Sequence, residues 1–274
     1  MLDALKDALR HYQCEDQACF VEQFDAIFTL TLGVKPKYAI LIDSFYKIQK
    51  HIRSKSSIRE LLEVIDAIKT ERANEMFFLQ KAVSLVDVQG KNILIYDHSH
   101  SVQHALSTLK ESGKSFSILI AGQDLKKTDD NISFAHYLGV PYKVVPAYML
   151  SHLDKTIDVA FFGAVTLQEG TQFVMDPGSK SIIAHLHLEK KPMYVFLTTS
   201  KFSLWPIESH QKEIYVKTHR RKHHHLSEIE FDHVKFSHDR VGADLINYTV
   251  TEKGIFTPTQ LLKEYQTLRE KRAL

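Results

Sequence analysis

The chain has 274 residues, a length that suits one large α/β domain or one with a smaller appendage. Hydrophobic residues make up 44% and charged residues 25%, which is ordinary globular composition and excludes long disordered stretches. The 35 Lys and Arg against 33 Asp and Glu leave a net charge of +2, so no global basic field exists to hold nucleic acid or a membrane surface. We therefore expect no membrane association and no direct nucleic-acid binding.

The chain has two cysteines, Cys14 and Cys19, which are too few for a disulfide framework. Their spacing matches no redox or zinc motif, and neutral or buried thiols are expected. The first ten residues mix apolar and charged side chains, unlike the apolar core of a signal peptide. No apolar run approaches the roughly 20 residues that span a bilayer. We expect a reduced, cytoplasmic protein.

The first third of the chain is predicted to form a helical N-terminal domain over residues 1–88. Apolar residues recur at helical spacing over 2–9 and again over 20–28. Ser57 and Glu60 form the Ser-x-x-Glu pattern of a capping box, and an apolar run follows them. A helix is therefore predicted to begin at this point.

Strand and helix patterns alternate through the α/β domain predicted over residues 89–274. Five short apolar runs predict strands, at 92–96, 115–121, 142–145, 158–164 and 193–197. Helices are predicted between them, at 102–109, up to Leu138, just before Asp158 and over 179–189. The strands are continuously apolar, which is typical of parallel strands buried on both faces. The alternation predicts a doubly wound, mostly parallel sheet, and hence an α/β fold.

Ligands of doubly wound sheets bind beyond the carboxyl ends of the strands, which here are residues 96–101, 121–124, 163–179 and 198–202. The sequence contains no Gly-x-Gly-x-x-Gly, no complete Walker lysine loop and no Gly-x-Ser-x-Gly. The common nucleotide-binding and hydrolase signatures are therefore missing.

The turn from Asp97 to Ser101 opens a predicted helix directly after the first predicted strand. Its backbone N–H groups and the hydroxyls of Ser99 and Ser101 suit a bound phosphate. Plain N-capping by Asp97, Ser99 or Ser101 explains the same residues. Both interpretations stay open at the level of the sequence.

The 16 histidines include His98 and His100 in this turn and the run His223–His225. No cysteine or carboxylate spacing completes a ligand set, so surface histidines are favoured and no metal site is expected. The basic run His219–Lys222 lies in a polar stretch, residues 217–227, that is predicted to be an exposed loop. Contact of this run with phosphate or an acidic partner is the less favoured alternative.

Four segments of the α/β half resemble the translation initiation factor 2B alpha/beta/delta family, which includes the methylthioribose-1-phosphate and ribose-1,5-bisphosphate isomerases. The segments are residues 92–106, 157–179, 193–203 and 244–258, in the family's order. Gly163-Ala164 and Gly178-Ser179 keep the family's spacing without a gap. The N-terminal part resembles the family only in its helical character, without a matching sequence segment.

The resemblance implies a helical N-terminal domain followed by a sheet domain of the NagB/RpiA/CoA-transferase type. It also implies a sugar-phosphate pocket, for which the ligand-binding candidates are Asp97, His98, Ser99, Ser101, Gly163, Ala164, Gly178, Ser179 and Lys201. Two helix N-termini and Lys201 are expected to hold a small anion weakly. No cofactor is expected.

The sequence departs from the isomerases where the resemblance places their chemistry. Asp97 stands where they carry a cysteine, and Val165 where they carry an aspartate. The family's Asn-Lys falls on Met175-Asp176, and its Arg-Pro is missing from residues 122–125. A valine cannot transfer a proton, and the carboxylates of Asp97 and Asp176 oppose a phosphate, although Asp97 can itself act as a base. No catalytic residue is therefore assigned.

We expect a non-catalytic factor 2B subunit-like protein that regulates or scaffolds and senses a phosphorylated sugar or nucleotide. One alternative is an aldose-ketose isomerase of a phosphorylated sugar with altered catalytic residues. Another is a module that binds a nucleotide or sugar phosphate without turnover. The expected partners are a second copy, related subunits or a translation factor, and a small phosphorylated ligand.

The expected homodimer comes from an apolar C-terminal block that resembles the family's dimer-forming end. Its residues are Ala243, Leu245, Ile246, Tyr248, Val250, Ile255 and Phe256. The block is richer in aliphatic and aromatic side chains than a lone surface segment needs. Packing of the block on its own sheet explains the same pattern without a partner.

Overall fold

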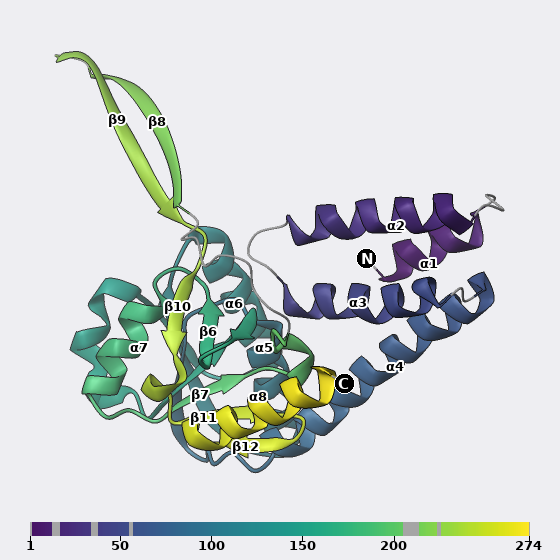
Figure 1. Cartoon of the computed structure of the whole chain (residues 1–274). Helices are drawn as coiled ribbons and strands as arrows, with labels where there is room; N and C mark the ends of the chain where they lie inside the picture. Colours follow the sequence, from purple (N-terminus) through teal and green to yellow (C-terminus); the bar gives the residue numbers. More distant parts are fainter. Residues whose placement is uncertain are drawn as a thin grey trace.

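Four helices form the N-terminal region: α1 (Leu2–Arg10), α2 (Gln17–Leu32), α3 (Ala39–Arg53) and α4 (Ile58–Val83). The computed structural model describes residues 2–12, 17–33, 38–54, 57–204, 214–223 and 226–273. The four helices lie side by side (Figure 1), and they bury an apolar cluster that includes Phe24, Phe45 and Ile65. The helical character predicted for this region is present.

The long helix α4 begins with the capping box that the sequence predicts. Ser57 Oγ accepts a hydrogen bond from Glu60 N at 3.3 Å, and Glu60 Oε2 accepts one from Ser57 N at 2.6 Å. These bonds lower the pKa of Glu60. The helix has 26 residues, so at about 1.5 Å per residue it extends roughly 39 Å. That length lets Leu79 and Val83, near its end, pack into the α/β half of the chain.

A seven-stranded sheet forms the centre of that half. Its strands are β1 (Lys91–Ile95), β2 (Phe116–Gly122), β3 (Tyr142–Pro146), β4 (Val159–Gly163), β7 (Met193–Phe196), β11 (Tyr248–Thr251) and β12 (Gly254–Phe256). They lie in the order β12-β11-β7-β4-β1-β2-β3, and only β12 is antiparallel to its neighbour. All five predicted strands are in this sheet, which confirms the α/β fold class.

Helices cover both faces of the sheet. They are α5 (His100–Glu111), α6 (Leu125–Leu138), α7 (Ser179–Leu188), α8 (Pro258–Ala273) and the 3₁₀ helix η1 (Ala147–Thr156). Ile93 and Ile118 pack with α4, α5 and α6, whereas Leu94 and Leu119 pack with α7, α8 and η1. Neighbouring strand residues therefore face different apolar layers, and this is why the strands are continuously apolar.

A second, three-stranded antiparallel sheet follows directly on the carboxyl end of β4. It consists of β5 (Thr166–Gln168), β6 (Gln172–Met175) and β10 (Asp239–Gly242). Asp239 is paired with Met175 in the β10–β6 register. This pairing brings β10 beside residues 176–178, which lead into α7. The 3₁₀ helix η3 (Ala243–Leu245) then connects β10 to β11.

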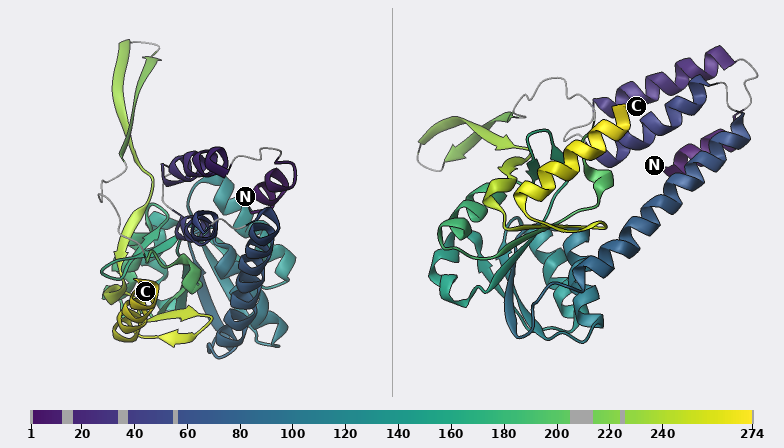
Figure 2. Two further views of the ribbon diagram at one scale, coloured as in Figure 1. Left: turned by 45° about the vertical axis from the view of Figure 1, so that its right-hand side comes forward. Right: turned by 60° about the horizontal axis from the view of Figure 1, so that its bottom comes forward.

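The strands β8 (Ile214–His223) and β9 (Leu226–Phe236) form an antiparallel hairpin that projects from the body of the molecule (Figures 1 and 2). The prediction of an exposed loop over residues 217–227 is therefore wrong, apart from His224 and His225, which lie outside the described residues. The strand pattern is masked in the sequence because the hairpin carries polar side chains on both faces. Neither face is selected for burial against the core.

The helical region meets the α/β half near the carboxyl edge of the main sheet. Ala39 N, at the start of α3, donates to Thr166 Oγ1 of β5 at 3.2 Å. Arg72 of α4 donates to the backbone O of Ile40 at 2.6 Å, which ties α4 to α3 at the same end. The domain boundary between residues 88 and 89 stays a prediction, since α4 contributes to the apolar clusters of both parts.

The apolar C-terminal block packs largely within the chain. Ala243, Ile246 and Val250 belong to the buried clusters of the main sheet, and Phe256 packs against them. Tyr248 is 38% exposed and stacks on Tyr194 of β7. The pattern that suggests a dimer therefore has an explanation inside one chain.

Candidate functional site

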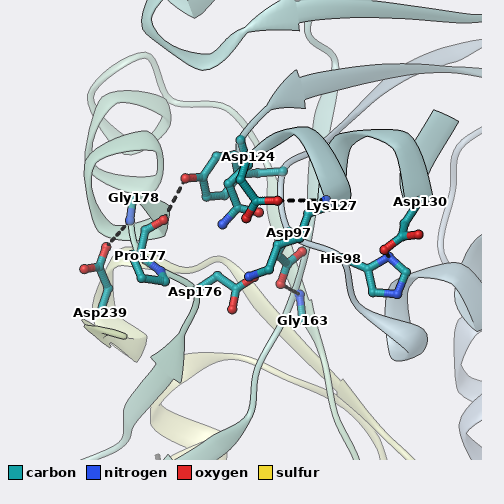
Figure 3. Close-up of polar contacts among 12 residues, drawn as sticks. Asp97, His98, Asp124, Lys127, Asp130, Gly163, Asp176, Pro177, Gly178 and Asp239 are labelled. Carbon is teal, nitrogen blue, oxygen red and sulfur yellow. Dashed lines mark hydrogen bonds and ion pairs between the residues drawn. The ribbon is translucent and has the colours of Figure 1, made fainter. Parts of the chain in front are cut away.

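The carboxyl ends of β1 and β4 lie where the strand order of the sheet reverses. β1 leads through α5 to β2 on one side, whereas its neighbour on the other side is β4. Open parallel sheets bind ligands in the crevice at such a switch point. Asp97 follows β1 and Gly163 ends β4, so two of the predicted segments meet here (Figure 3).

Asp97 bridges the two strands. Its Oδ2 accepts a hydrogen bond from Gly163 N at 3.0 Å, and its backbone O accepts one from Asn131 Nδ2 of α6 at 3.3 Å. Asp97 is 5% exposed, and its Oδ1 has no hydrogen-bond partner among the described residues. Burial, followed by the negative charge of Asp176, raises the pKa of Asp97 to about 7. The carboxyl group therefore exchanges its proton near neutral pH.

Gly163 provides the space that Asp97 and Ser99 occupy. A Cβ at Gly163 would lie 1.9 Å from Ser99 Oγ, so a side chain does not fit there. Ser99 is the N-cap of α5, and its Oγ accepts a hydrogen bond from Val102 N at 3.4 Å. Glycine at the end of β4 thus allows the capping hydroxyl to approach the strand closely. The structure shows capping by Ser99, while anion binding there stays a prediction.

Lys201 completes a compact polar cluster at the switch point. It ends the 3₁₀ helix η2 (Thr199–Lys201) after β7, and its Nζ donates to Ser101 Oγ and to Ala164 O, each at 3.2 Å. Burial lowers the pKa of Lys201, and the charge of Asp97 opposes this effect. We name this set the switch-point cluster; it consists of Asp97, Ser99, Ser101, Gly163, Ala164 and Lys201.

His98 is oriented towards α6. Its Nδ1 lies 3.8 Å from Asp130 Oδ2, and its ring packs edge-on against His100 with centroids 5.3 Å apart. Figure 3 shows the pairing with Asp130, with Asp97 and Gly163 of the switch-point cluster nearby. The structure thus gives His98 structural partners of its own, and a role in ligand binding stays a prediction.

Gly178 and Ser179 form a separate group at the start of α7. Asp239 Oδ2 accepts hydrogen bonds from Gly178 N and Lys180 N, each at 2.9 Å (Figure 3). Tyr96 donates to Pro177 O at 2.7 Å, and a Cβ at Gly178 would lie 2.2 Å from the Tyr96 hydroxyl oxygen. The carboxylate of Asp239 thus occupies the position where the helix N-terminus would hold an external anion.

The role of Asp239 is not visible in the sequence alone. The residue is 61 positions from Gly178, and only the pairing of β10 with β6 brings it beside the α7 start. Ser179 is fully buried, and its Oγ has no hydrogen-bond partner in the described part of the chain.

An ion pair between Lys127 and Asp176 lies next to Asp97. Lys127 comes from the first turn of α6, and Asp176 from the loop between β6 and α7. The negative charge of Asp176 contributes to the raised pKa of Asp97, and the positive charge of Lys127 partly offsets it. Sequence reasoning identified Asp176 as a charge opposing phosphate but missed Lys127, because the partners are 49 residues apart. The positive charge of Lys127 offsets part of the negative charge of Asp176, which would repel a phosphate.

Acidic side chains from α4 and from the turn after β11 surround the loop that carries Lys201. Glu252 accepts hydrogen bonds from Thr199 N at 3.0 Å and from the Thr199 hydroxyl. Burial raises the pKa of Glu75, hydrogen bonding from Ser200 opposes this, and the charge of Glu252 adds to it. A pocket of about 260 Å³ opens here, with Glu75, Thr199 and Ser200 in its lining. Sequence reasoning missed this second polar group.

In the part of the chain that the structure describes, no three His, Cys, Asp or Glu side chains gather as a metal-binding group. Within the same ranges no helix is long and apolar enough to cross a lipid bilayer. Cys19 is half-buried and accepts a hydrogen bond from Gln23 Nε2 at 3.3 Å, whereas Cys14 lies outside the described residues.

Comparison with known families and folds identifies relatives of this architecture. The model of the Initiation factor 2 subunit family matches residues 1–258, which include the helical N-terminal region. Among curated protein sequences, none matched the chain.

Several solved structures share the fold. The translation initiation factor eIF-2B of Pyrococcus horikoshii OT3 is 16% identical, with a TM-score of 0.78 over 95% of this chain and 90% of that one. The eIF2B beta subunit of Chaetomium thermophilum is 16% identical, with a TM-score of 0.65 over 97% of this chain and 82% of that one. A chain of the tetrameric eIF2B-beta2-delta2 complex from C. thermophilum is 16% identical, with a TM-score of 0.69 over 97% and 86%.

Proposed function

Because the chain belongs to the Initiation factor 2 subunit family, we propose that it acts as a non-catalytic factor 2B subunit-like protein with a regulatory or scaffolding role. The observation that carries the proposal is the bond from Gly163 N to the Asp97 carboxylate, which spans the switch point where a substrate would bind. Asp97 and Gly163, which the resemblance places in the isomerase site, are thus hydrogen-bonded to each other.

Two further contacts support this proposal. Lys201 Nζ donates to two oxygens of the chain itself, Ser101 Oγ and Ala164 O. Val165, which stands at the position of the isomerases' aspartate, has an aliphatic side chain, and its N–H donates to Val174 O at 2.9 Å. Movement of a hydrogen between sugar carbons needs a group that manages the hydroxyl proton, and valine has none.

A coupled assay at high protein concentration tests the non-catalytic role, with methylthioribose-1-phosphate and ribose-1,5-bisphosphate as substrates. We expect no detectable turnover, because losing one placed acid or base costs about 10²–10⁴ in rate and two are replaced here. Turnover above about 1 per second, within the ordinary range for enzymes, that is abolished by Asp97→Ala or His98→Ala would contradict the proposal.

The second candidate is an aldose-ketose isomerase of a phosphorylated sugar with altered catalytic residues. A specific observation favours it: the pKa of Asp97, raised to about 7, suits a general acid or base at neutral pH. In that case the pH profile of turnover would follow a group titrating near neutrality, and Asp97→Asn would remove it. The same coupled assay therefore separates the two candidates.

We also propose that the switch-point cluster senses a small phosphorylated ligand, which it binds weakly. Ser99 and Ser101 at the α5 start and the Nζ of Lys201 are the groups available for this role. The family's Arg and Lys are replaced, and charged hydrogen bonds contribute about 1.5–3 kcal/mol each, so affinity is expected to be low.

Isothermal calorimetry with inorganic phosphate and with ribose-1,5-bisphosphate measures this binding. Lys201→Ala is expected to abolish it, whereas Lys110→Ala, an exposed lysine in the last turn of α5, is the matched control and is expected to leave it unchanged. Binding that survives Lys201→Ala would refute this placement of the site. Micromolar binding of a sugar bisphosphate would refute the expected weakness.

The partners proposed are a second copy of the chain, related subunits or a translation factor, in the cytoplasm. One of the solved structures with this fold is a tetrameric complex of two kinds of subunit, which supports a role in assembly. A sensing site at the carboxyl edge of the sheet and a scaffolding role for the rest of the surface are compatible, because they use different parts of the chain.

A further inference from the structure

The hairpin of β8 and β9 extends away from the rest of the molecule in every view (Figures 1 and 2). Val216, Phe231 and Val234 are each about half exposed, at 58%, 46% and 48%, so the described part of the hairpin buries little apolar surface. An isolated two-stranded hairpin is marginally stable in water. Its length and composition therefore call for an explanation other than the stability of the core.

The strand register sorts the described side chains of the hairpin into two faces. Cross-strand partners are Lys217 with His233, Thr218 with Asp232, His219 with Phe231 and Arg220 with Glu230. Because successive residues of a strand point to opposite faces, Lys217, His219, Phe231, His233 and Lys235 share one face. We name these five residues the basic face. Val216, Thr218, Arg220, Glu230, Asp232, Val234 and Phe236 lie on the opposite face.

The carboxylates of the described hairpin lie on the opposite face, where they have partners. Arg220 Nε donates to Glu230 at 2.8 Å, and Thr218 Oγ1 donates to Asp232 at 2.7 Å. The basic face carries two lysines, two histidines and a phenylalanine, so its positive charge is not offset by an acid on the same face. The two faces of the hairpin therefore differ in charge, with the carboxylates of its described residues on one face and the lysines of the basic face on the other.

The sequence of this segment is also basic. Residues 217–225 contain four Lys or Arg and four His, and neither Asp nor Glu. The net charge of +2 for the whole chain, from which no nucleic-acid binding is expected, averages this segment with an acidic remainder. Local charge, not the average, attracts a polyanion, because salt screens charges more than about 10 Å apart.

Aromatic rings lie between the cations of the basic face. The rings of His219 and Phe231 stack with centroids 5.7 Å apart and 18° between their planes, and His233 lies 5.7 Å from His219. Phe231 is 46% exposed, so part of its ring is open to solvent. Cations beside exposed rings suit a ligand that supplies phosphates and flat, unpaired bases.

We propose that the basic face of the β8–β9 hairpin binds single-stranded nucleic acid. Lys217 and Lys235 pair with phosphates, and the ring of Phe231 stacks on a base that is not stacked in a duplex. An acidic peptide without aromatic side chains would pair with the lysines but would offer no ring to stack on Phe231. This inference goes beyond the proposed function and is independent of it, since it concerns a surface away from the carboxyl edge of the main sheet.

Fluorescence anisotropy with labelled single-stranded RNA and DNA of about 20 nucleotides, over a series of salt concentrations, tests the proposal on the full chain. A Kd of roughly 1–100 µM at physiological salt is expected, as for non-sequence-specific binding. Lys217→Gln with Lys235→Gln is expected to lower the slope of log K against log salt by about 1.4, since each phosphate contact to a single strand contributes about 0.7. Lys143→Gln with Lys155→Gln removes the same charge from exposed positions on the body and is expected to leave the slope unchanged.

Stacking is tested separately from charge. Phe231→Leu is expected to weaken binding roughly 5- to 100-fold, whereas Phe231→Tyr keeps the ring and retains binding. Arg220→Gln, on the opposite face, is the control for the choice of face. The proposal is overturned if Arg220→Gln weakens binding as much as Lys217→Gln, if duplex binds more tightly than single strands, or if polyglutamate of equal charge binds as tightly as RNA. The last outcome would assign the hairpin to an acidic protein partner.

Discussion

At the scale of single residues, Asp97 and Asp239 are the side chains that most constrain what the site can do. Asp97 receives the Gly163 N–H across the switch point, and Asp239 receives two N–H groups of the α7 start. Both are acidic side chains placed where the resemblance to the isomerases leads one to expect an external phosphate. A site filled by its own carboxylates needs either protonation or displacement of those groups before it can hold an anion.

The pH dependence of stability reports the state of Asp97. Its pKa is raised from 3.8 to about 7 by burial, so the folded state binds more protons than the unfolded state between these values. Stability from this group is fully present below pH 4 or so and is lost as the pH rises through about 7. Asp97→Asn keeps an acceptor for Gly163 N but cannot ionise. Urea unfolding between about pH 5 and pH 8 is expected to show a loss larger in the wild type than in Asp97→Asn, by on the order of 2 kcal/mol.

The control for this experiment is Asp129→Asn, a change of the same kind at an exposed position of α6. It is expected to follow the wild type across the pH range. An Asp97→Asn variant with the same pH dependence as the wild type would show that the buried carboxyl is not the titrating group.

Removal of Asp239 is expected to expose an anion site at the start of α7. Asp239→Ala leaves Gly178 N and Lys180 N without their acceptor and is expected to cost about 1–3 kcal/mol of stability. Inorganic phosphate can then replace the carboxylate, so it should raise the Tm of Asp239→Ala more than that of the wild type at matched ionic strength. Asp239→Asn, which retains one acceptor, should lie between them. An equal phosphate effect on all three proteins would contradict the idea that Asp239 substitutes for an anion.

At the scale of secondary-structure elements, α4 links the helical region to the α/β half. Its first turn is fixed by the capping box, and its last turns lie in the apolar cluster of the main sheet. The start of α4 is exposed, so the cap contributes to stability mainly by satisfying N–H groups that have no partner within the helix.

Ser57→Ala tests the contribution of this cap. The substitution removes the acceptor of Glu60 N and is expected to destabilise the protein by about 1 kcal/mol in urea unfolding. Thr70→Ala is the matched control, because Thr70 is an exposed hydroxyl in the middle of the same helix that bonds back to Asp66 O. It is expected to change stability by no more than about 0.5 kcal/mol. Equal losses in the two variants would assign the effect to the helix in general.

At the scale of the whole molecule, we predict a homodimer in solution. The prediction rests on the resemblance of the apolar C-terminal block to the family's dimer-forming end. Tyr248 of this block is 38% exposed, although most of the block packs inside the chain. Light scattering on a sizing column is expected to give about 63 kDa, twice the chain mass of 31.6 kDa. A species of one chain mass at micromolar concentration would refute the prediction, and a larger even multiple would extend it.

The sequence by itself determined five strands of the main sheet and the fold class, because these depend on short-range patterns. The apolar runs at 92–96 and 158–164 predict β1 and β4 to within one or two residues, and Ser57 with Glu60 predicts the start of α4. Gly139, in the left-handed conformation at φ 66°, ends α6 where the sequence predicts a helix end. Periodicity, caps and glycines act within a few residues, so one sequence suffices to read them.

Only the tertiary structure decided which polar groups meet. The pairs Lys127 with Asp176, Gly163 with Asp97 and Gly178 with Asp239 join residues 49, 66 and 61 positions apart, and each depends on how strands pair and where the chain returns. The β8–β9 hairpin escaped prediction because polar side chains on both of its faces mask the strand pattern in the sequence. Long-range strand pairing decides which charged groups meet at the site and which of them occupy it. Local sequence patterns do not show that pairing.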